Sequence, residues 1–482
     1  MNRSEFLKRM GLGTVAIAAG PSLLTSCMDH GMGGEAPNVV DGVFNNPLKV
    51  PETINGTSAL SAQGGMETLG NGGEVSVLGY GVGLLGPTIR VQKDQNVNLN
   101  FTNKLSEHTN IHWHGLVIPA AMDGHPDHMI MPNESFNFQF PVIQQAGTNW
   151  YHPHLHGLTG KQVTKGLAGM FIVESEEEKA LNLPSGAYEV PLIIQDKRLN
   201  SGGGITYNPT MGEVMTGFLG ETILVNGTNK PFLEVESRFY RFRILNGSTA
   251  RIYNLALSDG GDFYVIGSDG GLLPKPEIVK NLLLSSGERA DILIDFSNVK
   301  EGKMLYLMNE KFSGMGSAQG DQSFNIIRFN VRNSENAEFI LPTSLIPLTN
   351  LSGASKTRPF KLTMNMGQNM SGMHQINGKV FESDRIDETV ELRSTEIWEF
   401  DNTSGDEAHP MHVHGVHFQI VARTGGRNTI VPHERGWKDT VLVAPREKVQ
   451  VIMKFEQLGK FVVHCHNLEH EDDGMMLNFK VL

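Results

Sequence analysis

The C-terminal end of the chain concentrates side chains that bind soft metals. His464-Cys465-His466 is followed by His470 and Met475, all within twelve residues. One Cys with two His and a weak axial Met is the ligand set of a blue copper electron-transfer centre. A single Cys or a His pair is also common as an ordinary buried side chain, so the rest of the chain has to decide between the two interpretations.

The spacing around Cys465 predicts two metal sites rather than one. If this segment is a strand, its side chains alternate between the two faces of a sheet. Cys465 then faces one side, and His464 and His466 face the other. A metal bound by Cys465 is therefore one residue away from imidazoles that face a second site. This arrangement predicts electron transfer between two metal centres.

Three other segments contain His-x-His pairs, a spacing that places both imidazoles on one face of a strand. The pairs lie at 112–114 and 152–156 in the first part of the chain, and at 409–414 near its end. One such pair is weak support for a metal site, whereas several pairs at matching positions are strong support. The histidines therefore predict metal ligands in both the first and the last part of the chain.

A repeated pattern indicates which elements hold these residues. Segments 86–112, 225–255 and 376–412 each contain a short alternating strand that ends in Asn, then a turn and another strand. The markers are roughly 150 residues apart, which is the size of a domain; they are Asn103, Asn246 and Asn402. The middle repeat carries no His pair.

Length and composition favour an all-β protein of several domains. At 482 residues the chain is too long for one compact core. Its 54 Gly and 22 Pro, with few long amphipathic runs, favour short strands joined by turns. An acidic stretch after Glu174 and a polar linker from Asn333 to about Lys356 separate the repeats. We expect three β-domains over 48–178, 186–333 and 357–482.

Charge and cysteine content exclude some classes of function. The formal net charge of −12 argues against a protein that binds the phosphate backbone of nucleic acids. The only cysteines are Cys27 and Cys465, and Cys27 lies in a leader. The folded body then has one thiol and no internal disulfide. In an exported protein, that thiol needs burial or a metal to protect it from oxidation.

The first 27 residues have the features of an export signal. Basic residues precede an apolar segment from Met10 to Leu24 that is too short to cross a bilayer. Leu24–Cys27 resembles a lipobox, so we expect lipid attachment at Cys27, with conventional cleavage as the alternative. The start also resembles a twin-arginine signal, but Ser4 stands where the second Arg belongs. We expect export to the periplasm or cell envelope and a flexible tether over 28–47.

The complete set of motifs resembles that of the three-domain bacterial multicopper oxidases, close to the laccase-like and cuprous-oxidase members. Four motifs carry this resemblance: HWHG at 112–115, HPH at 152–154, HPxHxH at 409–414 and HCHxxxHxxxxM at 464–475. It covers essentially the whole chain after the leader. The resemblance implies three cupredoxin-like β-barrel domains, with a type 1 copper in the last and a three-copper cluster between the first and the last.

The resemblance also implies which residues bind the four copper ions. The type 1 copper ligands are then His409, Cys465, His470 and, as the weak axial ligand, Met475. His112 and His412 hold the type 2 copper. The type 3 pair is held by His114, His152, His154, His414, His464 and His466.

The family pattern leaves His156 outside the copper ligands, as a structural or supporting residue. We also expect surface or structural roles for seven further histidines: His30, His108, His125, His128, His374, His417 and His433. Asp123 and Glu471 match acidic positions that the family uses near the three-copper cluster. We expect them to supply protons as general acids, with ordinary turn or surface carboxylates as the alternative.

The implied reaction is the four-electron reduction of O2 to water, coupled to one-electron oxidation of a substrate at the type 1 copper. Thioethers select Cu(I), and methionines cluster between Met364 and Met373. A role in copper tolerance would follow; the alternative is that Met364 and Met366 are strand residues of the core. Asp406, Glu407 and the pair at 472–473 could instead attract cations or aromatic amines. We therefore expect Cu(I), phenols or aromatic amines as reductants of a monomeric enzyme.

Two other function classes remain open at this point. One is a non-catalytic periplasmic scaffold that keeps the fold without copper, and the intact ligand set argues against it. The other is an enzyme like copper nitrite reductase, which would keep a type 1 site. Such an enzyme would not need both His464 and His466, or the pair at 152–154.

Overall fold

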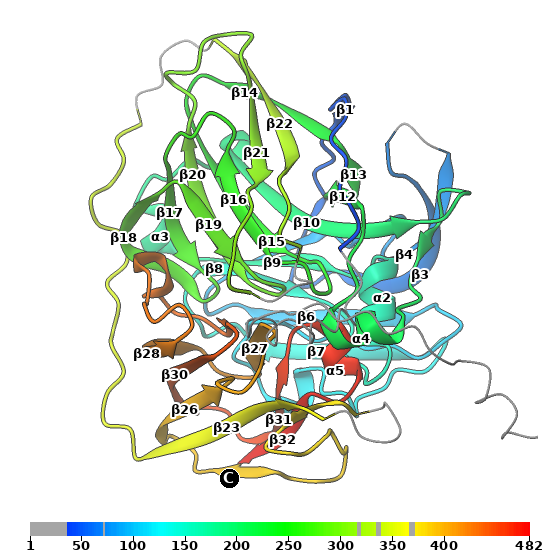
Figure 1. Ribbon diagram of the computed structural model, residues 1–482, viewed down its shortest axis with the longest axis vertical. Coiled ribbons are helices and arrows are strands. Elements are labelled where there is room, and N and C mark those ends of the chain that lie inside the picture. The colour runs from blue at the N-terminus through cyan, green and yellow to red at the C-terminus, as the bar shows by residue number, and fades with distance from the viewer. Residues whose placement is uncertain (1–35, 71–72, 316–319, 334–338, 366–371) are drawn as a thin grey trace, which may run out of the picture. The chain divides into compact units, whose positions relative to one another are not determined.

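A computed structural model (Figure 1) describes residues 36–70, 73–315, 320–333, 339–365 and 372–482. The expected leader over 1–27, including its lipid attachment site, lies outside the described residues, and so do Met366 and Met370. The described chain consists mainly of strands and has few helices, as expected for an all-β protein. None of the helices in these ranges is long and apolar enough to span a lipid bilayer.

The first third of the described chain forms two four-stranded sheets, in the orders β2-β5-β9-β8 and β4-β3-β6-β7. In β6, the inward positions Val97, Leu99 and Phe101 are buried and the residues between them face outward, so period-2 alternation creates the core face. The strands are β2 (Thr53–Asn55), β3 (Ala59–Thr68), β4 (Glu74–Tyr80), β5 (Thr88–Gln92), β6 (Asn96–Asn103), β7 (Ser135–Pro141), β8 (Gly147–Tyr151) and β9 (Gly169–Glu174).

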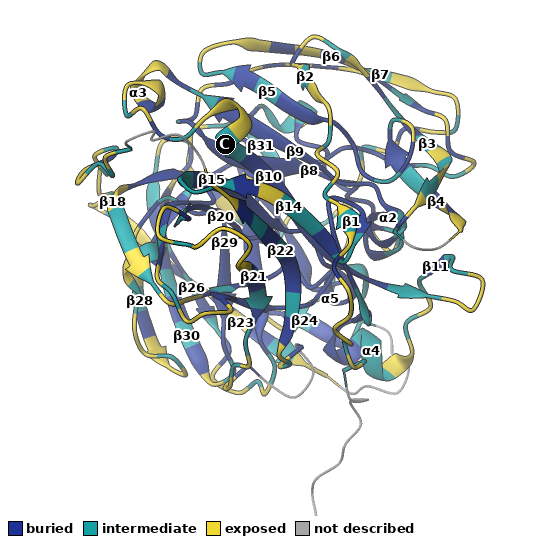
Figure 2. Ribbon diagram, turned by 90° about the horizontal axis from the view of Figure 1, so that it is seen from above, coloured by how far each residue is buried: buried dark blue, intermediate teal, exposed yellow. Residues whose placement is uncertain are grey.

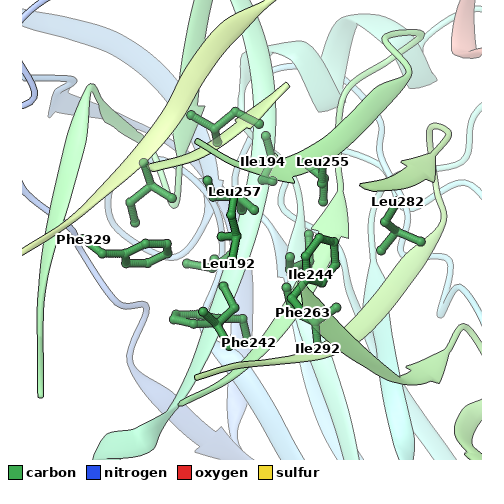
Figure 3. Packing of buried hydrophobic residues seen from close by; sticks show 14 of the residues in the cluster. Leu192, Ile194, Phe242, Ile244, Leu255, Leu257, Phe263, Leu282, Ile292 and Phe329 are labelled. Carbon is green, nitrogen blue, oxygen red and sulfur yellow. The ribbon is translucent and has the colours of Figure 1, made fainter. Parts of the chain in front are cut away.

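The middle third forms two larger sheets, in the orders β14-β22-β21-β16-β19 and β13-β12-β10-β15-β20-β17-β18, with β11 paired to β10. Figure 3 shows the apolar core that these strands enclose, in which the rings of Phe242 and Phe329 lie 5.3 Å apart. The first strands are β10 (Glu189–Leu199), β11 (Ile205–Thr206), β12 (Thr222–Val225), β13 (Thr228–Asn229), β14 (Pro231–Glu236) and β15 (Phe239–Asn246). The others are β16 (Tyr253–Leu257), β17 (Phe263–Ser268), β18 (Gly271–Val279), β19 (Asn281–Leu284), β20 (Arg289–Asp295), β21 (Met304–Asn309) and β22 (Phe324–Arg332).

The last third forms two five-stranded sheets, in the orders β24-β23-β26-β30-β28 and β25-β32-β31-β27-β29. Cys465 and Met475 belong to the hydrophobic core that these sheets enclose. The strands are β23 (Lys356–Met364), β24 (His374–Ile376), β25 (Glu388–Val390), β26 (Thr395–Asp401), β27 (His409–Val413), β28 (Phe418–Gly425), β29 (Thr440–Val443), β30 (Glu447–Lys454), β31 (Gly459–Cys465) and β32 (Met476–Val481).

Helices are short and lie between strands. The α-helices are α2 (Thr159–Lys165), α3 (Glu176–Lys179), α4 (Met211–Thr216) and α5 (Leu468–Asp472), and the 3-10 helices are η1 (Ala120–Met122), η2 (Gly186–Tyr188) and η3 (Pro432–Glu434). Figure 2 shows that exposed residues gather on peripheral loops, whereas the central strands are buried. Helix α5 contacts both α2 and α4, which brings the C-terminal motif against both preceding thirds.

The three Asn markers perform the same task in each repeat. The side-chain amide of each one donates two hydrogen bonds to main-chain carbonyls. These bonds hold the following turn in place. Asn103 bonds Glu107 O and Ile130 O at 2.9 and 2.8 Å. Asn246 bonds Arg251 O and Leu284 O, and Asn402 bonds Glu407 O and Ala444 O. Buried carbonyls need such partners, so the repeated Asn reflects repeated local architecture.

The expected flexible tether over 28–47 is wrong for its described part, 36–47. Strand β1 (Asn46–Pro47) pairs in parallel with β14 of the middle third. Phe44 is only 3% exposed and packs edge-on against Tyr306, and the Asp41 carboxylate accepts hydrogen bonds from Asn325. The polar, Gly-rich composition suggested a free chain, but one buried aromatic ring and a strand edge hold this segment in place.

Candidate metal centre

Three donor atoms from the last third meet at one buried point, which we call the Cys465 cluster. Cys465 Sγ lies 3.6 Å from Nδ1 of both His409 and His470, and these two nitrogens are 3.2 Å apart. His409 opens β27, Cys465 closes β31, and His470 lies in α5. Met475 is fully buried beside them, and its main chain bonds to Cys465 N and His470 O at 3.0 and 2.8 Å.

The chemistry of the Cys465 cluster is that of a dry, soft ligand set. Burial raises the pKa of the Cys465 thiol, so only a bound cation would stabilise its thiolate form. Burial lowers the pKa of His409 to about 3, so its imidazole is neutral. His470 Nε2–H donates to Met215 O at 3.0 Å, which leaves Nδ1 free to face Cys465.

Eight imidazoles meet at a second buried point, the eight-histidine cluster, formed by the first and last thirds. Its closest nitrogen pairs are His154 Nε2 to His464 Nε2 and His414 Nε2 to His464 Nε2, both at 3.1 Å. His112 Nε2 lies 3.4 Å from His412 Nε2. The members are His112, His114, His152, His154, His412, His414, His464 and His466, each at most 1% exposed.

The register of two strands explains why the two clusters adjoin without merging. Strand β31 pairs antiparallel with β27, with Cys465 opposite Met411 and His464 opposite His412. Alternation then sends Cys465 to the core face and His464 to the opposite face. His466, one residue past the strand, returns to the eight-histidine side, where its ring lies 5.7 Å from that of His464.

Carboxylates support the eight-histidine cluster from two sides. Asp123 Oδ2 accepts from His414 Nδ1 at 2.7 Å, and its main-chain carbonyl accepts from His112 Nδ1 at 2.8 Å. Burial raises the pKa of Asp123 well above its usual range. Glu471 is fully buried, with its carboxylate oxygens 3.2 Å from His464 Nδ1 and 3.5 Å from His154 Nδ1.

Asp439 is a third supporting carboxylate, which the sequence motifs did not single out. Its Oδ1 accepts from His114 Nε2 at 3.0 Å, and its main-chain carbonyl accepts from His412 Nδ1 at 2.8 Å. Burial alone would raise the pKa of Asp439, but the adjacent Arg289 guanidinium outweighs burial and holds it well below its usual range. The carboxylate is therefore an anionic acceptor. Asp439 lies immediately before β29, and no motif in the sequence marked it.

A pocket of about 280 Å³ opens beside His409. Its lining includes Met364, His374, Asp406 and Glu407. The His374 ring stacks on that of His470 at 3.7 Å, and its buried Nε2 has no hydrogen-bond partner among the residues that the structure describes. Burial and the neighbouring Asp406 raise the pKa of Glu407 to about 7.

The other residues named from the sequence lie apart from the two clusters or take supporting places. His156 is exposed, with its ring 5.3 Å from that of Phe381. His374, expected to be a surface or structural residue, is fully buried in contact with the Cys465 cluster. Of the methionine cluster, Met364 is 45% exposed at the pocket and Met373 is buried. The stack joins His374 in β24 to His470 in α5, which are far apart in sequence, so no local pattern indicated this contact.

Comparisons with known proteins agree with this architecture. Residues 65–178 and 353–482 each match a family model described as multicopper oxidase. The multicopper oxidase mco of Staphylococcus haemolyticus is 35% identical over 432 residues, covering 88% of each chain. The crystal structure of the McoA multicopper oxidase from Aquifex aeolicus aligns with a TM-score of 0.83 at 35% identity, covering 90% of this chain and 99% of that one.

The chain belongs to the multicopper oxidase family. Its three pairs of sheets are therefore three cupredoxin-like domains. Multicopper oxidases carry four copper ions, one type 1, one type 2 and two type 3. They couple one-electron oxidation of a substrate to reduction of O2, which makes this protein an oxidoreductase.

The protonation pattern of the eight-histidine cluster fits copper binding. Six of the eight imidazoles direct Nδ1–H to an oxygen acceptor, so their Nε2 atoms are unprotonated. Two such lone pairs at 3.1 Å cannot hydrogen-bond to each other, whereas a cation between them satisfies both. His114 Nδ1, His152 Nε2 and His466 Nε2 are buried without any protein partner. Neutral imidazoles with one fixed N–H are the usual form of metal-binding His.

Some relatives of this multicopper oxidase carry a different name. The cell division protein FtsP of Xenorhabdus nematophila is 35% identical over 460 residues, covering 92% of this chain and 94% of that one. Overall similarity therefore does not separate an oxidase from a cell division protein. The metal-binding side chains separate the two possibilities. Both the Cys465 cluster and the eight-histidine cluster are present here, which favours the oxidase.

Proposed function

We propose that this multicopper oxidase takes electrons from a small reductant at the Cys465 cluster and passes them to O2 at the eight-histidine cluster. The observation that carries the proposal is the junction at Cys465. Its side chain belongs to one cluster, while both adjacent residues, His464 and His466, belong to the other. Electrons that enter at Cys465 thus reach the second cluster through a few covalent bonds.

The donor geometry supports a specific assignment of the four ions. Type 1 copper would be held by His409, Cys465, His470 and Met475. Type 2 copper would be held by His112 and His412. One type 3 ion would be held by His154, His414 and His464, and the other by His114, His152 and His466. This grouping follows the nitrogen pairs at 3.1 and 3.4 Å and the three unpartnered nitrogens.

When bound, the copper ions supply one-electron redox steps and the site of four-electron O2 reduction. The protein positions the imidazoles through carbonyl and carboxylate acceptors and keeps both clusters out of bulk water. Asp123 and Glu471 are buried carboxyl groups that contact imidazoles of the second cluster without an arginine partner, whereas Asp439, the third such group, is paired with Arg289. We assign them to hold and deliver protons there, and Asp123 also to orient His112 and His414.

The substrate proposal depends on the pocket beside His409. Asp406 and Glu407 make it acidic, and Met364 and the free Nε2 of His374 add soft donors. A cationic reductant is therefore favoured, either Cu(I) or an aromatic amine that carries a separate positively charged group, over a neutral phenol. A Cu(I) substrate would connect the enzyme with copper tolerance.

One experiment tests the oxidase and its substrate class together. Copper-loaded protein is assayed for a blue absorption band and for O2 uptake with Cu(I), an aromatic amine and a phenol. In Glu407→Gln, we expect the KM for the two cations to rise roughly tenfold while the phenol is little affected. Glu456→Gln, an exposed carboxylate outside this pocket, is the control. Colourless protein without O2 uptake contradicts the oxidase, whereas equal changes for cations and phenol contradict only the substrate proposal.

We also propose that the chain is exported, with Cys27 as a lipid anchor, because of the leader described above. Domain boundaries at 48–178, 186–333 and 357–482 are supported by one pair of sheets within each interval, apart from β1 and the first residue of β23. Mass spectrometry of the envelope-fractionated protein tests the anchor: a diacylated N-terminal Cys27 is expected. An unmodified or differently cleaved N-terminus contradicts it.

A further inference from the structure

The middle third supplies none of the proposed copper ligands, yet one of its segments touches the eight-histidine cluster. This segment, Ser285–Arg289, links β19 to the start of β20. All five residues are buried. Two of its side chains connect to the cluster: Ser286 contacts His466 directly, and Arg289 acts through Asp439.

Ser286 determines which nitrogen of His466 carries the proton. Its hydroxyl donates to Ser248 O at 2.6 Å, so its oxygen is left to accept from His466 Nδ1–H at 3.1 Å. His466 Nε2 is then unprotonated, and this is the nitrogen that is buried without a protein partner. Ser286 thus prepares the atom that we assign to a type 3 copper.

Gly287 lets the segment approach the same ring. Its φ is +81°, a left-handed conformation that favours glycine. A Cβ there would lie 2.9 Å from carbon atoms of the His466 ring. The backbone therefore packs directly on the imidazole and limits its rotation.

Arg289 forms a bidentate ion pair with Asp439, and each of its N–H groups has an acceptor. Nη1 donates to Asp439 Oδ1 at 2.7 Å, and Nη2 donates to Asp439 Oδ2. The remaining donors reach main-chain carbonyls of Thr148, Asp269 and Gly287 at 2.9–3.1 Å. A guanidinium with all five N–H groups satisfied is rigid, so the Asp439 carboxylate that meets His114 is rigid as well.

The corresponding positions of the other two repeats do not have this feature. Glu288 accepts a hydrogen bond from the main-chain nitrogen three residues before it, and Glu134 and Glu447 do the same. The residues that follow those two are Ser135, which is exposed, and Lys448, which is half-buried. A fully buried Arg at this place is specific to the middle repeat, which lies against the cluster.

We infer that Ser286 and Arg289 are positioning residues for the three-copper site, through which the middle domain fixes the imidazoles of His466 and His114. This inference depends on the ligand assignment of the proposed function. The middle domain then acts on the copper site through hydrogen bonds to ligands rather than by supplying ligands.

The test compares copper retention in Ser286→Ala, Arg289→Met and Arg289→Lys with that of the unaltered protein. Arg243→Met is the matched control, because Arg243 is equally buried in carboxylate pairs of the middle third but contacts no histidine. Copper per chain is measured during titration with a chelator. The type 2 paramagnetic signal reports the three-copper site, and the blue band reports the Cys465 cluster in the same sample.

We expect Ser286→Ala and Arg289→Met to lose three-copper-site ions at roughly 10- to 100-fold lower chelator concentration, with the blue band retained. Arg289→Lys should lose less copper than Arg289→Met, since lysine keeps the positive charge but lacks the planar guanidinium that binds both carboxylate oxygens. Normal retention in Ser286→Ala and Arg289→Lys overturns the inference, as does an equal loss in Arg243→Met. Should Arg289→Met not fold, Ser286→Ala alone decides. Absence of both signals in the unaltered protein contradicts the proposed function instead.

Discussion

His464 lies directly opposite His412 in the antiparallel pair of β31 and β27, with ring centroids 5.4 Å apart. The next register pair places Cys465 opposite Met411 in the core of the last domain. One step along a single strand therefore separates a histidine of one cluster from the thiol of the other. Cys465 therefore links the two clusters: its side chain belongs to one, and the residue next to it belongs to the other.

Replacing Cys465 by Ser should remove the blue absorption and abolish turnover, because a hydroxyl does not replace a thiolate as a soft ligand. The protein should bind three copper ions instead of four, measured by metal analysis. Burying a hydroxyl in this core costs roughly 1–3 kcal/mol, so the domains should still fold. Retention of the blue band would contradict the assignment of Cys465.

Replacing Glu471 by Gln should lower turnover by roughly 100-fold or more, because a buried proton donor near the eight-histidine cluster is lost. The loss should grow as pH rises and solvent supplies fewer protons. Steady-state O2 uptake across pH measures both effects. Glu469→Gln is the control, since Glu469 lies in the same helix but contacts Tyr207 and Phe218 N instead of a histidine.

Asp123→Asn should act on binding as well as on turnover. Its carboxylate accepts from His414 Nδ1 at 2.7 Å, and an amide is a weaker acceptor at that place. We expect copper affinity of the three-copper site to fall roughly 10-fold or more, measured by competition with a chelator. An unchanged affinity with reduced turnover would leave proton delivery as the only role of Asp123.

Lys197 predicts a pH-dependent stability unrelated to copper. Burial lowers the pKa of Lys197 to about 7, and its ammonium contacts only Val163 O among the hydrogen-bond partners we find in the described residues. Between about pH 7 and its unfolded pKa, the unfolded chain binds more protons than the folded one, so stability rises with pH. Lys197→Met should remove this rise and stabilise the protein at pH 7 by roughly 2–4 kcal/mol.

Thermal unfolding of copper-free Lys197→Met and unaltered protein from pH 6.5 to 9.5 provides the comparison. The difference between the two melting temperatures should shrink as pH increases. Lys179→Met, at an exposed lysine, should run parallel to the unaltered protein. Parallel curves for Lys197→Met as well would show that the buried amine does not titrate in this range.

The segment before the first domain should contribute measurably to stability. Phe44→Ala removes a buried ring that packs on Tyr306, and we expect a loss of roughly 3 kcal/mol. Val43→Ala, at a 71% exposed neighbour, should change stability by less than about 0.5 kcal/mol. Denaturant unfolding compares the two variants. Equal effects would mean that this segment is not held against the middle domain.

Residue types and local spacing were enough to predict an all-β fold and that Cys465 and His464 face opposite sides of one strand. Strand alternation depends only on neighbouring residues, and it holds for β31. The His pairs at 112–114 and 152–154 were also expected on strands, but they lie in an isolated bridge and in turn or irregular chain outside the named strands. The markers Asn103, Asn246 and Asn402 likewise indicated three repeats, since each one satisfies the same local carbonyls. Such features follow from covalent geometry and can be predicted without knowing what packs against them.

Only the tertiary structure decided which distant groups support those donors. Arg289 and Asp439 are 150 residues apart. His374 stacks directly on His470, which is also distant from it in the sequence. Nothing in their local sequence distinguishes them from ordinary charged or surface residues. The same holds for Phe44, whose burial turns an expected tether into part of the fold. Such contacts form only when whole sheets pack against each other. That packing is determined by many residues together, so no single motif predicts it.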